Sequence, residues 1–511
     1  MSNLQEKWFR SLLRRRFFIV ILLLIQIAAI LYTLVSRSIA SKITASGLTI
    51  LSLAVCLYII SRRDKGAFKL SWVFTIMMFP LFGGLFYLIF KAQSVSRKLA
   101  DIRTMSHEKV LTSSDNSDVA LQVLGEVAPE HVPVARYLKD TACFALYSNS
   151  DAEYLSPGES FYEKLLTELE KAEKYIFLEF FIIQEGKMWG SILEILKKKA
   201  AQGVKVRLIY DDVGCFLKLP AGYAGSLREM GIETVVFNPF RPVLTSLQNN
   251  RDHRKIAVID GKTAFTGGVN LADEYINAVE RFGHWKDAGV MVKGAAAWSF
   301  TLMFLQMWQL CSRTDEDYEQ YRPESQQAYN DGFMQPWADS PIDRENVGEH
   351  VYLHMINRAK KYIYINTPYL IVDDSMVSAL ILAAKSGVDV RIVTPHKWDK
   401  RLVHMTTRSY YRELIDGGVK IYEYSRGFIH SKTFLCDDEC ANIGTMNLDF
   451  RSLYLHYECG LWLYGSRAVG QLKEDYLDTL KQCRPIGAED CRSGLITTLF
   501  QEILRLFAPL M

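Results

Sequence analysis

Three long apolar stretches dominate the first 95 residues of the chain. Residues 17–35, 43–60 and 70–90 contain no charged side chain. A helix of roughly 20 apolar residues is long enough to cross a bilayer. The pattern therefore predicts a membrane anchor of two or three transmembrane helices over residues 1–95. The third stretch contains Pro80 and the pair Gly83-Gly84, which are typical of a kinked span, a close helix contact or a re-entrant turn.

Basic residues beside these stretches bear on topology. Five lysines and arginines precede residue 17, and four more lie between residues 62 and 69. The excess of positive charge in cytoplasmic loops places both groups inside the cell. Three full crossings would then put the remaining chain outside, which conflicts with the reducing compartment indicated by nine cysteines without a regular framework. We expect a multi-pass protein with its catalytic region on the cytoplasmic side, and the charges leave the number of crossings open.

From about residue 130 onward, the hydrophobic pattern occurs twice. Apolar, β-rich runs begin at residues 173–178 and 360–365, and helical patterns follow them. Gly203 and Gly387 then introduce new strand patterns, and further runs lie at 234–237 and 288–292 in the first copy and at 419–424 and 460–463 in the second. This alternation predicts an α/β fold of two similar repeats, 130–311 and 351–511, packed about a pseudo-twofold. The polar segment 312–350 is predicted to be a linker.

Composition narrows the class of protein only slightly. Hydrophobic residues make up 49% of the chain and charged residues 23%, which favours a folded protein over a disordered one. The net charge of +3 over 511 residues gives no reason to expect a nucleic-acid partner. Cys436 and Cys440 are spaced like half a metal site, but no second pair accompanies them, so we expect ordinary packing and no metal.

Both repeats carry the same chemically active residues at nearly the same spacing. Each has a histidine, a lysine two residues later, an aspartate after four more residues, and a glycine-containing segment that ends in asparagine. The asparagine lies ten positions after the aspartate in both copies. One such motif is common by chance, whereas two matched copies indicate a shared function. The residues are His253, Lys255, Asp260 and Asn270 in the first repeat, and His430, Lys432, Asp437 and Asn447 in the second.

These residue types suit the chemistry of a phosphodiester. Side chains two apart on a strand share a face, so each histidine lies beside its lysine, and two such faces can form one site. The lysines, with Asn270 and Asn447, can bind the non-bridging oxygens. One imidazole must be neutral to attack phosphorus, while the other must be protonated to release the leaving alkoxide. We therefore expect the two histidines to start in opposite protonation states.

An attacking histidine also needs an acceptor on its far nitrogen. Asp287 and Glu458 are the candidates, because they occupy matching positions before the strand that follows each motif; the alternative is a solvated turn carboxylate. Asp260 and Asp437 belong to the catalytic motifs but are followed by turn-like sequence. We expect them to support the motif loops through hydrogen bonds to the backbone.

The duplicated His-x-Lys-x4-Asp pattern, followed by glycine and asparagine, resembles the phospholipase D superfamily over most of residues 130–511. Within it, the chain is similar to the bacterial cardiolipin synthases in its apolar N-terminal segments, including Tyr87, and in its apolar end at Pro509-Leu510-Met511. The resemblance implies a bacterial membrane enzyme that joins two phosphatidylglycerol molecules and releases glycerol. It implies no metal or nucleotide cofactor, and membrane lipids as the partners.

The resemblance also implies a phosphatidyl-histidine intermediate on His253, with His430 as the acid and then the base. Thr445 stands where the first repeat has Gly268, and its hydroxyl could contact phosphate. A phospholipase D that transfers to water remains an alternative, and a nuclease is a more distant one. A scaffold with a decayed site is excluded because both motifs are intact. Residues 495–507 show a helical apolar stripe, which we expect to pack against the enzyme's own core, with membrane contact as the alternative.

Overall fold

The computed structural model describes residues 39–79, 97–115, 117–240, 246–325, 329–342 and 345–510, with the single positions 28, 84, 87, 88 and 327. The chain divides into two compact units. One consists of Met1–Ser96, Phe240–Asn249 and Glu502–Met511, and the other of Arg97–Pro239 and Asn250–Gln501. Each unit is described by itself.

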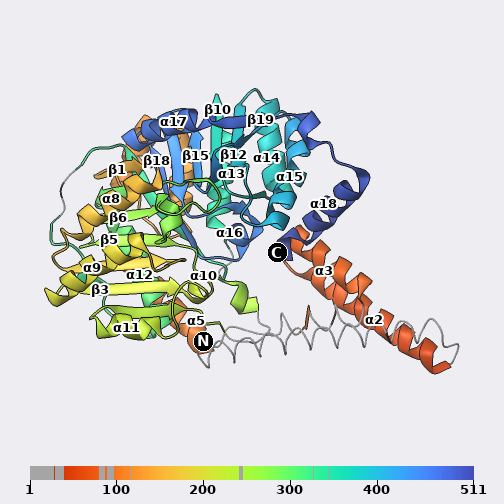
Figure 1. Ribbon diagram of the computed structural model, residues 1–511, viewed down its shortest axis with the longest axis horizontal. Helices are drawn as coiled ribbons and strands as arrows, with labels where there is room; N and C mark the ends of the chain where they lie inside the picture. Colours follow the sequence, from red (N-terminus) through yellow and green to blue (C-terminus); the bar gives the residue numbers. More distant parts are fainter. Residues whose placement is uncertain are drawn as a thin grey trace. The chain divides into compact units, whose positions relative to one another are not determined.

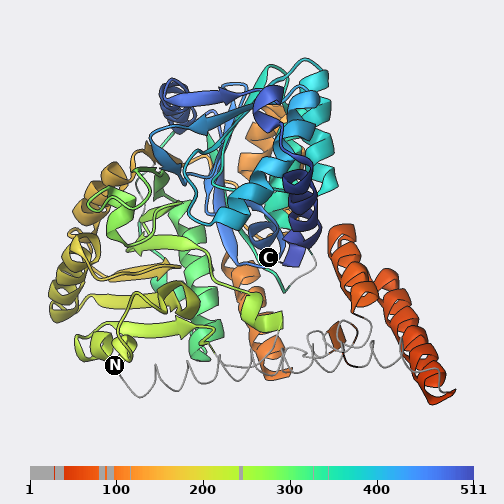
Figure 2. The same cartoon turned by 45° about the vertical axis from the view of Figure 1, so that its right-hand side comes forward.

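Two mixed sheets with the same strand order form the unit of Arg97–Pro239 and Asn250–Gln501 (Figures 1 and 2). In the first sheet, β2, β3 and β4 are parallel, and β5, β6, β8 and β1 continue it as antiparallel neighbours. Its strands in spatial order are β1 (Ser150–Leu155), β8 (Gly289–Gly294), β6 (Thr263–Gly267), β5 (Lys255–Ile259), β2 (Tyr175–Phe180), β3 (Lys205–Asp211) and β4 (Glu233–Phe237).

The second sheet repeats this order and adds one edge strand. Its strands in spatial order are β9 (Phe333–Asp339), β18 (Glu458–Tyr464), β16 (Cys440–Gly444), β15 (Thr433–Cys436), β10 (Tyr362–Asn366), β12 (Asp389–Pro395), β13 (Lys420–Tyr424) and the added β19 (Cys483–Ile486). The prediction of an α/β fold with two repeated sheets is therefore confirmed.

Helices connect the strands of both sheets, and most of them occupy corresponding places in the two repeats. In the first repeat they are α8 (Gly158–Leu169), α9 (Lys187–Ala201), α10 (Asp212–Cys215), α11 (Tyr223–Glu229) and α12 (Ala297–Ser312). In the second they are α13 (Val347–Arg358), α14 (Asp374–Lys385), α15 (Arg401–Asp416), α16 (Phe450–Tyr454) and α17 (Arg467–Leu480). Helices α5 (Arg97–Ser113), α6 (Asp118–Val127) and α7 (Val132–Asp140) precede the first sheet. Gly203 and Gly387 follow α9 and α14 with φ of +88° and +96°, which glycine adopts easily, and so start β3 and β12 as predicted.

Helix α12 lies in the core of this unit. Residues from Ala297 to Met303 are all buried, because its sequence is apolar around the whole circumference. It packs against β2, β4, β5, β6 and β8 of the first sheet and against β9 of the second. The two sheets also meet directly, since β6 contacts β16 and β18.

The segment 312–350 is more than the predicted linker, because it contains β9. This strand pairs with β18 and occupies the place that β1 has in the first sheet. Its polar residues are buried and bonded rather than solvated: the Gln335 amide donates to the carbonyl oxygens of Ala135 and Phe144 at 3.0 and 2.8 Å. The strand itself is mainly apolar, and its Phe333, Met334 and Trp337 are buried. It is short, it has no regular alternation of apolar and polar residues, and polar sequence lies on both sides of it, so the pattern did not single it out.

The N-terminal unit contains α2 (Ile39–Ser61) and α3 (Gly66–Met78). Val55, Ile59, Trp72 and Ile76 form a small apolar cluster between them. Within the described ranges, no helix combines the length and the apolar composition needed to cross a membrane. The predicted span at 17–35 lies outside the described residues apart from position 28, and so do Pro80 and Gly83 in the third stretch.

Helix α18 (Leu495–Phe507) differs from its prediction. Its apolar stripe was expected to pack against the core, but only Leu504 is buried. Leu495 and Ile496 are each 85% exposed, and Leu499 is 62% exposed. The last residues of the helix belong to the N-terminal unit, within which Ser71 Oγ donates to the carbonyl oxygen of Leu506 at 2.6 Å.

Candidate active site

Short strands at the boundary of the two repeats position the motif histidines. β14 (Gly427–Ile429) leads into His430 and pairs with β7 (His284–Lys286), which leads into Asp287 of the other repeat. His430 N–H donates to the carbonyl oxygen of Lys286 at 2.7 Å. The same exchange occurs at the other motif, where His253 N–H donates to the carbonyl oxygen of Tyr457 at 3.0 Å, next to Glu458. The exchange is reciprocal.

Each histidine therefore contacts a carboxylate of the other repeat. His253 Nδ1 lies 2.9 and 3.1 Å from the two oxygens of Glu458. His430 Nδ1 lies 2.7 Å from Asp287 Oδ2. Both carboxylates are fully buried, and both histidine side chains are 9% exposed. With Nδ1 donating to a carboxylate, each imidazole keeps its Nε2 for chemistry.

Neighbouring groups hold the two carboxylates. Asp287 Oδ1 accepts the Ala288 N–H at 2.8 Å, and a side chain at Gly268 would collide with that same oxygen. The Thr445 hydroxyl, at the position matching Gly268, donates to Glu458 Oε2. The suggestion that this hydroxyl contacts phosphate is therefore not supported, since it is already bonded to the carboxylate.

The motif lysines lie beside their histidines. Lys255 Nζ donates to the carbonyl oxygen of His253, and Lys432 Nζ to that of His430. Both ammonium groups are buried. Burial lowers the pKa of Lys255 to about 8 and that of Lys432 to about 7. An arriving phosphate would restore the charged forms, because a negative charge stabilises an ammonium group.

Both imidazoles are neutral in the free site. Burial and the nearby lysine charges hold the pKa of His253 well below its ordinary value and lower that of His430 to about 4. Burial alone would raise the pKa of Asp287, but the hydrogen bond with His430, the Lys432 charge and the Ala288 N–H together lower it, so Asp287 is ionised. Opposite protonation states were predicted for the histidines. The structure favours two neutral rings, because burial and the lysine charges disfavour an imidazolium before substrate binds.

The two asparagines differ from each other. Asn270 Oδ1 accepts the Ile182 N–H at 3.0 Å, and its Nδ2 donates to the Tyr275 hydroxyl at 2.8 Å. Asn447 is also buried, but its Oδ1 has no partner among the described residues. Asn270 is therefore occupied by the protein itself, and Asn447 is the better candidate for contact with a ligand.

Asp260 and Asp437 lie away from the histidines. Asp260 follows the five-residue strand β5, which Lys255 begins, so roughly 17 Å of strand separates the two ends. Its carboxylate accepts the backbone N–H groups of Glu173, Lys174 and Tyr175 at 2.7–2.8 Å. Asp437 accepts the equivalent groups of residues 360–362. The geometry gives both aspartates the supporting role argued from the turn sequence, and not a catalytic one.

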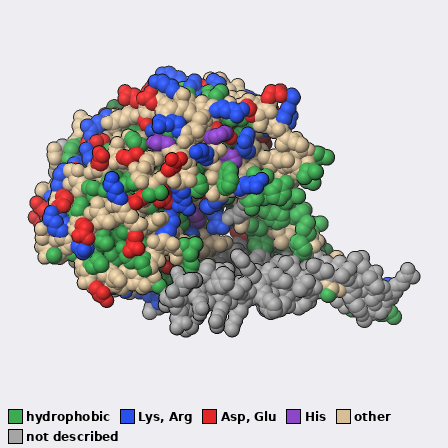
Figure 3. All heavy atoms as spheres, in the orientation of Figure 1, with side chains coloured by type: hydrophobic (Ala, Val, Ile, Leu, Met, Phe, Trp, Pro, Cys, Tyr) green, Lys and Arg blue, Asp and Glu red, His purple; other side chains and the backbone are tan. Residues whose placement is uncertain are grey.

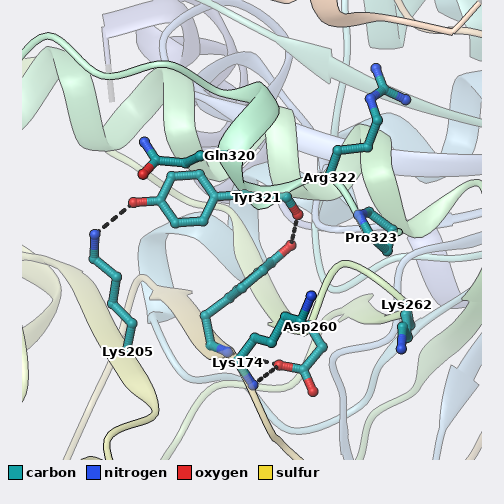
Figure 4. A pocket seen from close by; sticks show the side chains of 9 residues that line it. Lys174, Lys205, Asp260, Lys262, Gln320, Tyr321, Arg322 and Pro323 are labelled. Carbon is teal, nitrogen blue, oxygen red and sulfur yellow. Dashed lines mark hydrogen bonds between the residues drawn. The ribbon is translucent and has the colours of Figure 1, made fainter. Parts of the chain in front are cut away.

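A pocket of about 150 Å³ adjoins Asp260 (Figure 4). Its lining includes Lys174, Lys205, Lys262 and Tyr321. Lys205 Nζ donates to the Tyr321 hydroxyl at 2.7 Å, and Lys174 is paired with Glu324. Because this pocket is at the far end of β5, it is separate from the histidine site.

One residue of the site was missed from the sequence. His456 lies two residues before Glu458, and its ring centroid is 5.7 Å from that of His253. The matching residue in the first repeat is Trp285, whose ring centroid is 5.2 Å from that of His430. The one local signal was its position two residues before the candidate Glu458, and its contact with His253 of the other repeat is visible only in the fold.

His456 also completes a possible metal-ligand set. Donor atoms of His253, His456 and Glu458 lie within 4.8 Å of one another, the one such group among the described residues. The group joins two repeats, so sequence spacing could not reveal it. Glu458 is already bonded to His253 and Thr445, and two lysine charges act on His253. The donor set therefore fits an imidazole–carboxylate pair better than a resident cation.

Comparison with known proteins identifies the family of this chain. The model of the "Cardiolipin synthase, PLD-like domain" family matches residues 165–307 and 352–479, more than half of the chain. The model described as "Phospholipase_D-nuclease N-terminal" matches residues 47–91. An uncharacterised protein of Streptococcus mutans is 42% identical over 460 residues, which are 89% of this chain and 99% of that protein.

Named relatives agree with the family model. A cardiolipin synthase of Geobacillus sp. is 35% identical over 479 residues, covering 91% of this chain and 94% of that one. Among solved structures, the phosphatidylserine synthase of Haemophilus influenzae matches with a TM-score of 0.55 at 14% identity, over 74% of this chain and 98% of that one, a likeness of fold alone. By its matched domains and by these relatives, the chain belongs to the cardiolipin synthase family of phospholipase D-like proteins.

Proposed function

We propose that the protein is a cardiolipin synthase, which transfers a phosphatidyl group from one phosphatidylglycerol to another and releases glycerol. The observation that carries the proposal is the reciprocal pairing of His253 with Glu458 and of His430 with Asp287. Two oriented imidazoles beside two buried lysines form a site for exchanging one phosphodiester for another. Family membership supports phosphatidylglycerol as the substrate.

The first half of the reaction forms a covalent intermediate. Nε2 of His253 attacks phosphorus while its Nδ1 donates to Glu458. The bond from phosphorus to the glycerol oxygen breaks, and His430 gives that oxygen a proton, so glycerol leaves. Lys255 and Lys432 bind the non-bridging oxygens, and Asn447 Oδ1, an acceptor left unpaired by the described residues, takes a hydrogen bond from a substrate hydroxyl. The negative phosphodiester beside His430 raises the pKa of its imidazole in the complex. His430 therefore binds a proton there, which it lacks in the free site, and can act as the acid.

The second half reverses these roles. His430, now neutral, takes the proton from a hydroxyl of the second phosphatidylglycerol, and that oxygen attacks phosphorus. The bond from phosphorus to His253 breaks, which yields cardiolipin and restores the free imidazole. Bonds of the same type are broken and formed, so the exchange needs no nucleotide.

The rate should depend on the charge of the lysines. We expect kcat/KM to fall as the pH rises through 7 to 8, because Lys432 and Lys255 lose their protons in the free enzyme there. The Lys432→Arg variant keeps its charge, so its own pH profile should begin to fall at a higher pH. Initial rates at saturating and limiting phosphatidylglycerol would measure this. A wild-type profile that is flat above pH 7 would contradict the assignment.

We also propose that the protein is attached to the bacterial cell membrane by two or three N-terminal helices, with its catalytic region on the cytoplasmic side. The apolar stretches at 17–35, 43–60 and 70–90 support this, and the substrates are lipids. The exposed apolar residues of α18 are a further surface for lipid. Lipids with a photoreactive acyl chain should label residues in these stretches and in 495–507. Labelling of none of them in intact membranes would reject the attachment.

The rival functions are separable. A hydrolase would pass the same intermediate to water. A nuclease would need a basic surface, and over most of the visible face lysines and arginines are interspersed with acidic side chains (Figure 3). The test is lipid analysis of membranes that contain the protein and labelled phosphatidylglycerol. Cardiolipin with an equal amount of free glycerol supports the synthase, phosphatidic acid alone indicates a hydrolase, and no lipid product rejects phosphatidyl transfer.

A further inference from the structure

Both ring nitrogens of His456 are shielded from solvent. Among the described residues, neither Nδ1 nor Nε2 has a hydrogen-bond partner. Glu458 Oε1 lies 3.9 Å from Nδ1, which is too long for a hydrogen bond. Leaving buried polar atoms unpaired costs stability, so a side chain held this way marks a place where a ligand can supply the partners.

The ring lies on one side of the site only. It neighbours His253, whereas Trp285 takes the matching place beside His430. The Trp285 indole N–H points toward Asp287 Oδ2 at 3.5 Å, and an indole has no second polar atom. Packing against the catalytic imidazole is thus common to both positions, and the unmet polar atoms belong to His456 alone.

We infer that His456 binds the lipid phosphate at the His253 side of the site, by donating its ring N–H to a non-bridging oxygen. This rests on the proposed function and deepens it, because it adds a third donor to the two lysines. It also makes the site asymmetric, in favour of the histidine proposed to carry the phosphatidyl group.

The charge state suits this role. Burial holds the pKa of His456 well below its ordinary value. The ring therefore stays neutral, with one N–H to donate. A ring that stays neutral does not take up the proton that His430 transfers. His456 is therefore a binding residue and not an acid or base.

The His456→Phe variant of the full-length protein separates binding from packing. It removes both unmet nitrogens and keeps an aromatic ring against His253. We expect its Tm without ligand to equal or exceed that of the wild type. Its kcat/KM should fall about 10- to 100-fold, which corresponds to the loss of one hydrogen bond to a charged group. Stability and activity should thus change in opposite directions.

Asparagine and glutamine variants test the hydrogen bond itself. The Asn amide nitrogen can replace Nδ1 and the Gln amide nitrogen can replace Nε2, so one of the two should recover most of the lost activity. His456→Trp copies the first repeat and should remain as impaired as His456→Phe. Full activity in both aromatic variants would reduce His456 to a packing residue and overturn the inference.

Binding of inorganic phosphate gives a readout that needs no turnover. Phosphate should raise the Tm of the wild type and of His350→Asn, a surface control, but raise it less in His456→Phe. An equal shift in all three proteins overturns the inference. The inference is also overturned if glycerol raises the Tm of the wild type but not that of His456→Phe, while phosphate raises both equally. His456 would then contact the glycerol hydroxyls and not the phosphate. This assay remains informative even if cardiolipin synthesis itself is not found.

Discussion

The His253→Ala variant should lose about 10⁴-fold or more in the rate of cardiolipin formation, because no other group can attack phosphorus in its place. His430→Ala should lose a similar factor with phosphatidylglycerol, whose glycerol alkoxide is a poor leaving group without an acid. Both variants should lose activity because the two histidines act on the same phosphorus atom. The measurement is initial rate of glycerol release at matched protein levels.

A substrate with a good leaving group separates the two roles. A phosphatidyl ester of p-nitrophenol needs no proton to depart, so His430→Ala should still release p-nitrophenol in a single burst and retain the covalent phosphatidyl group. His253→Ala should give no burst. His350→Ala, a change at a histidine outside the site, should behave as the wild type in both assays. If the phosphate is instead found on a peptide containing His430, the roles of nucleophile and acid are reversed.

Local pattern was enough to predict the strands and the motifs, because a buried strand is apolar and an α/β repeat has a regular order. It was not enough for β9, a short run in which Gln335, Pro336 and Asp339 interrupt the apolar residues and which lies inside a polar segment. The sequence also did not predict the surroundings of α18. Helical periodicity shows that one face is apolar but not what covers that face. In the structure, Leu495 and Ile496 on α18 are exposed.

The site shows the same limit at a finer scale. Asp287 and Glu458 could be proposed as acceptors from their matching places, yet sequence alone does not say which histidine each one serves. The partner is chosen by β7 pairing with β14, a contact between residues more than 140 positions apart. His456 was missed for a related reason, since its importance comes from His253 in the other repeat and not from its own neighbours.

The pairing of each motif histidine with a carboxylate of the other repeat leads to a second large expected effect on the rate. Glu458→Gln and Asp287→Asn should each lower kcat about 10²- to 10⁴-fold, the range seen when the acceptor of a catalytic imidazole becomes an amide. The amide oxygen should remain with the existing donor, Thr445 for residue 458 and the Ala288 N–H for residue 287. The amide NH₂ then faces the histidine Nδ1, which forces the proton onto Nε2.

The two variants should therefore stop at different steps. With its Nε2 protonated, His253 in Glu458→Gln cannot attack, so no covalent phosphatidyl-enzyme should form. In Asp287→Asn, His253 can still attack the phosphatidyl ester of p-nitrophenol, whose leaving group needs no acid, but His430 cannot act as the base, so the intermediate should accumulate. Acid quenching with the labelled p-nitrophenyl ester measures both. Glu423→Gln is the matched control, because Glu423 is also a buried carboxylate bonded to a histidine, His396 at 2.9 Å, without contact to either motif histidine. If Glu458→Gln accumulates the intermediate and Asp287→Asn does not, His430 is the nucleophile, and the chemical roles follow the crossed pairs in the opposite order.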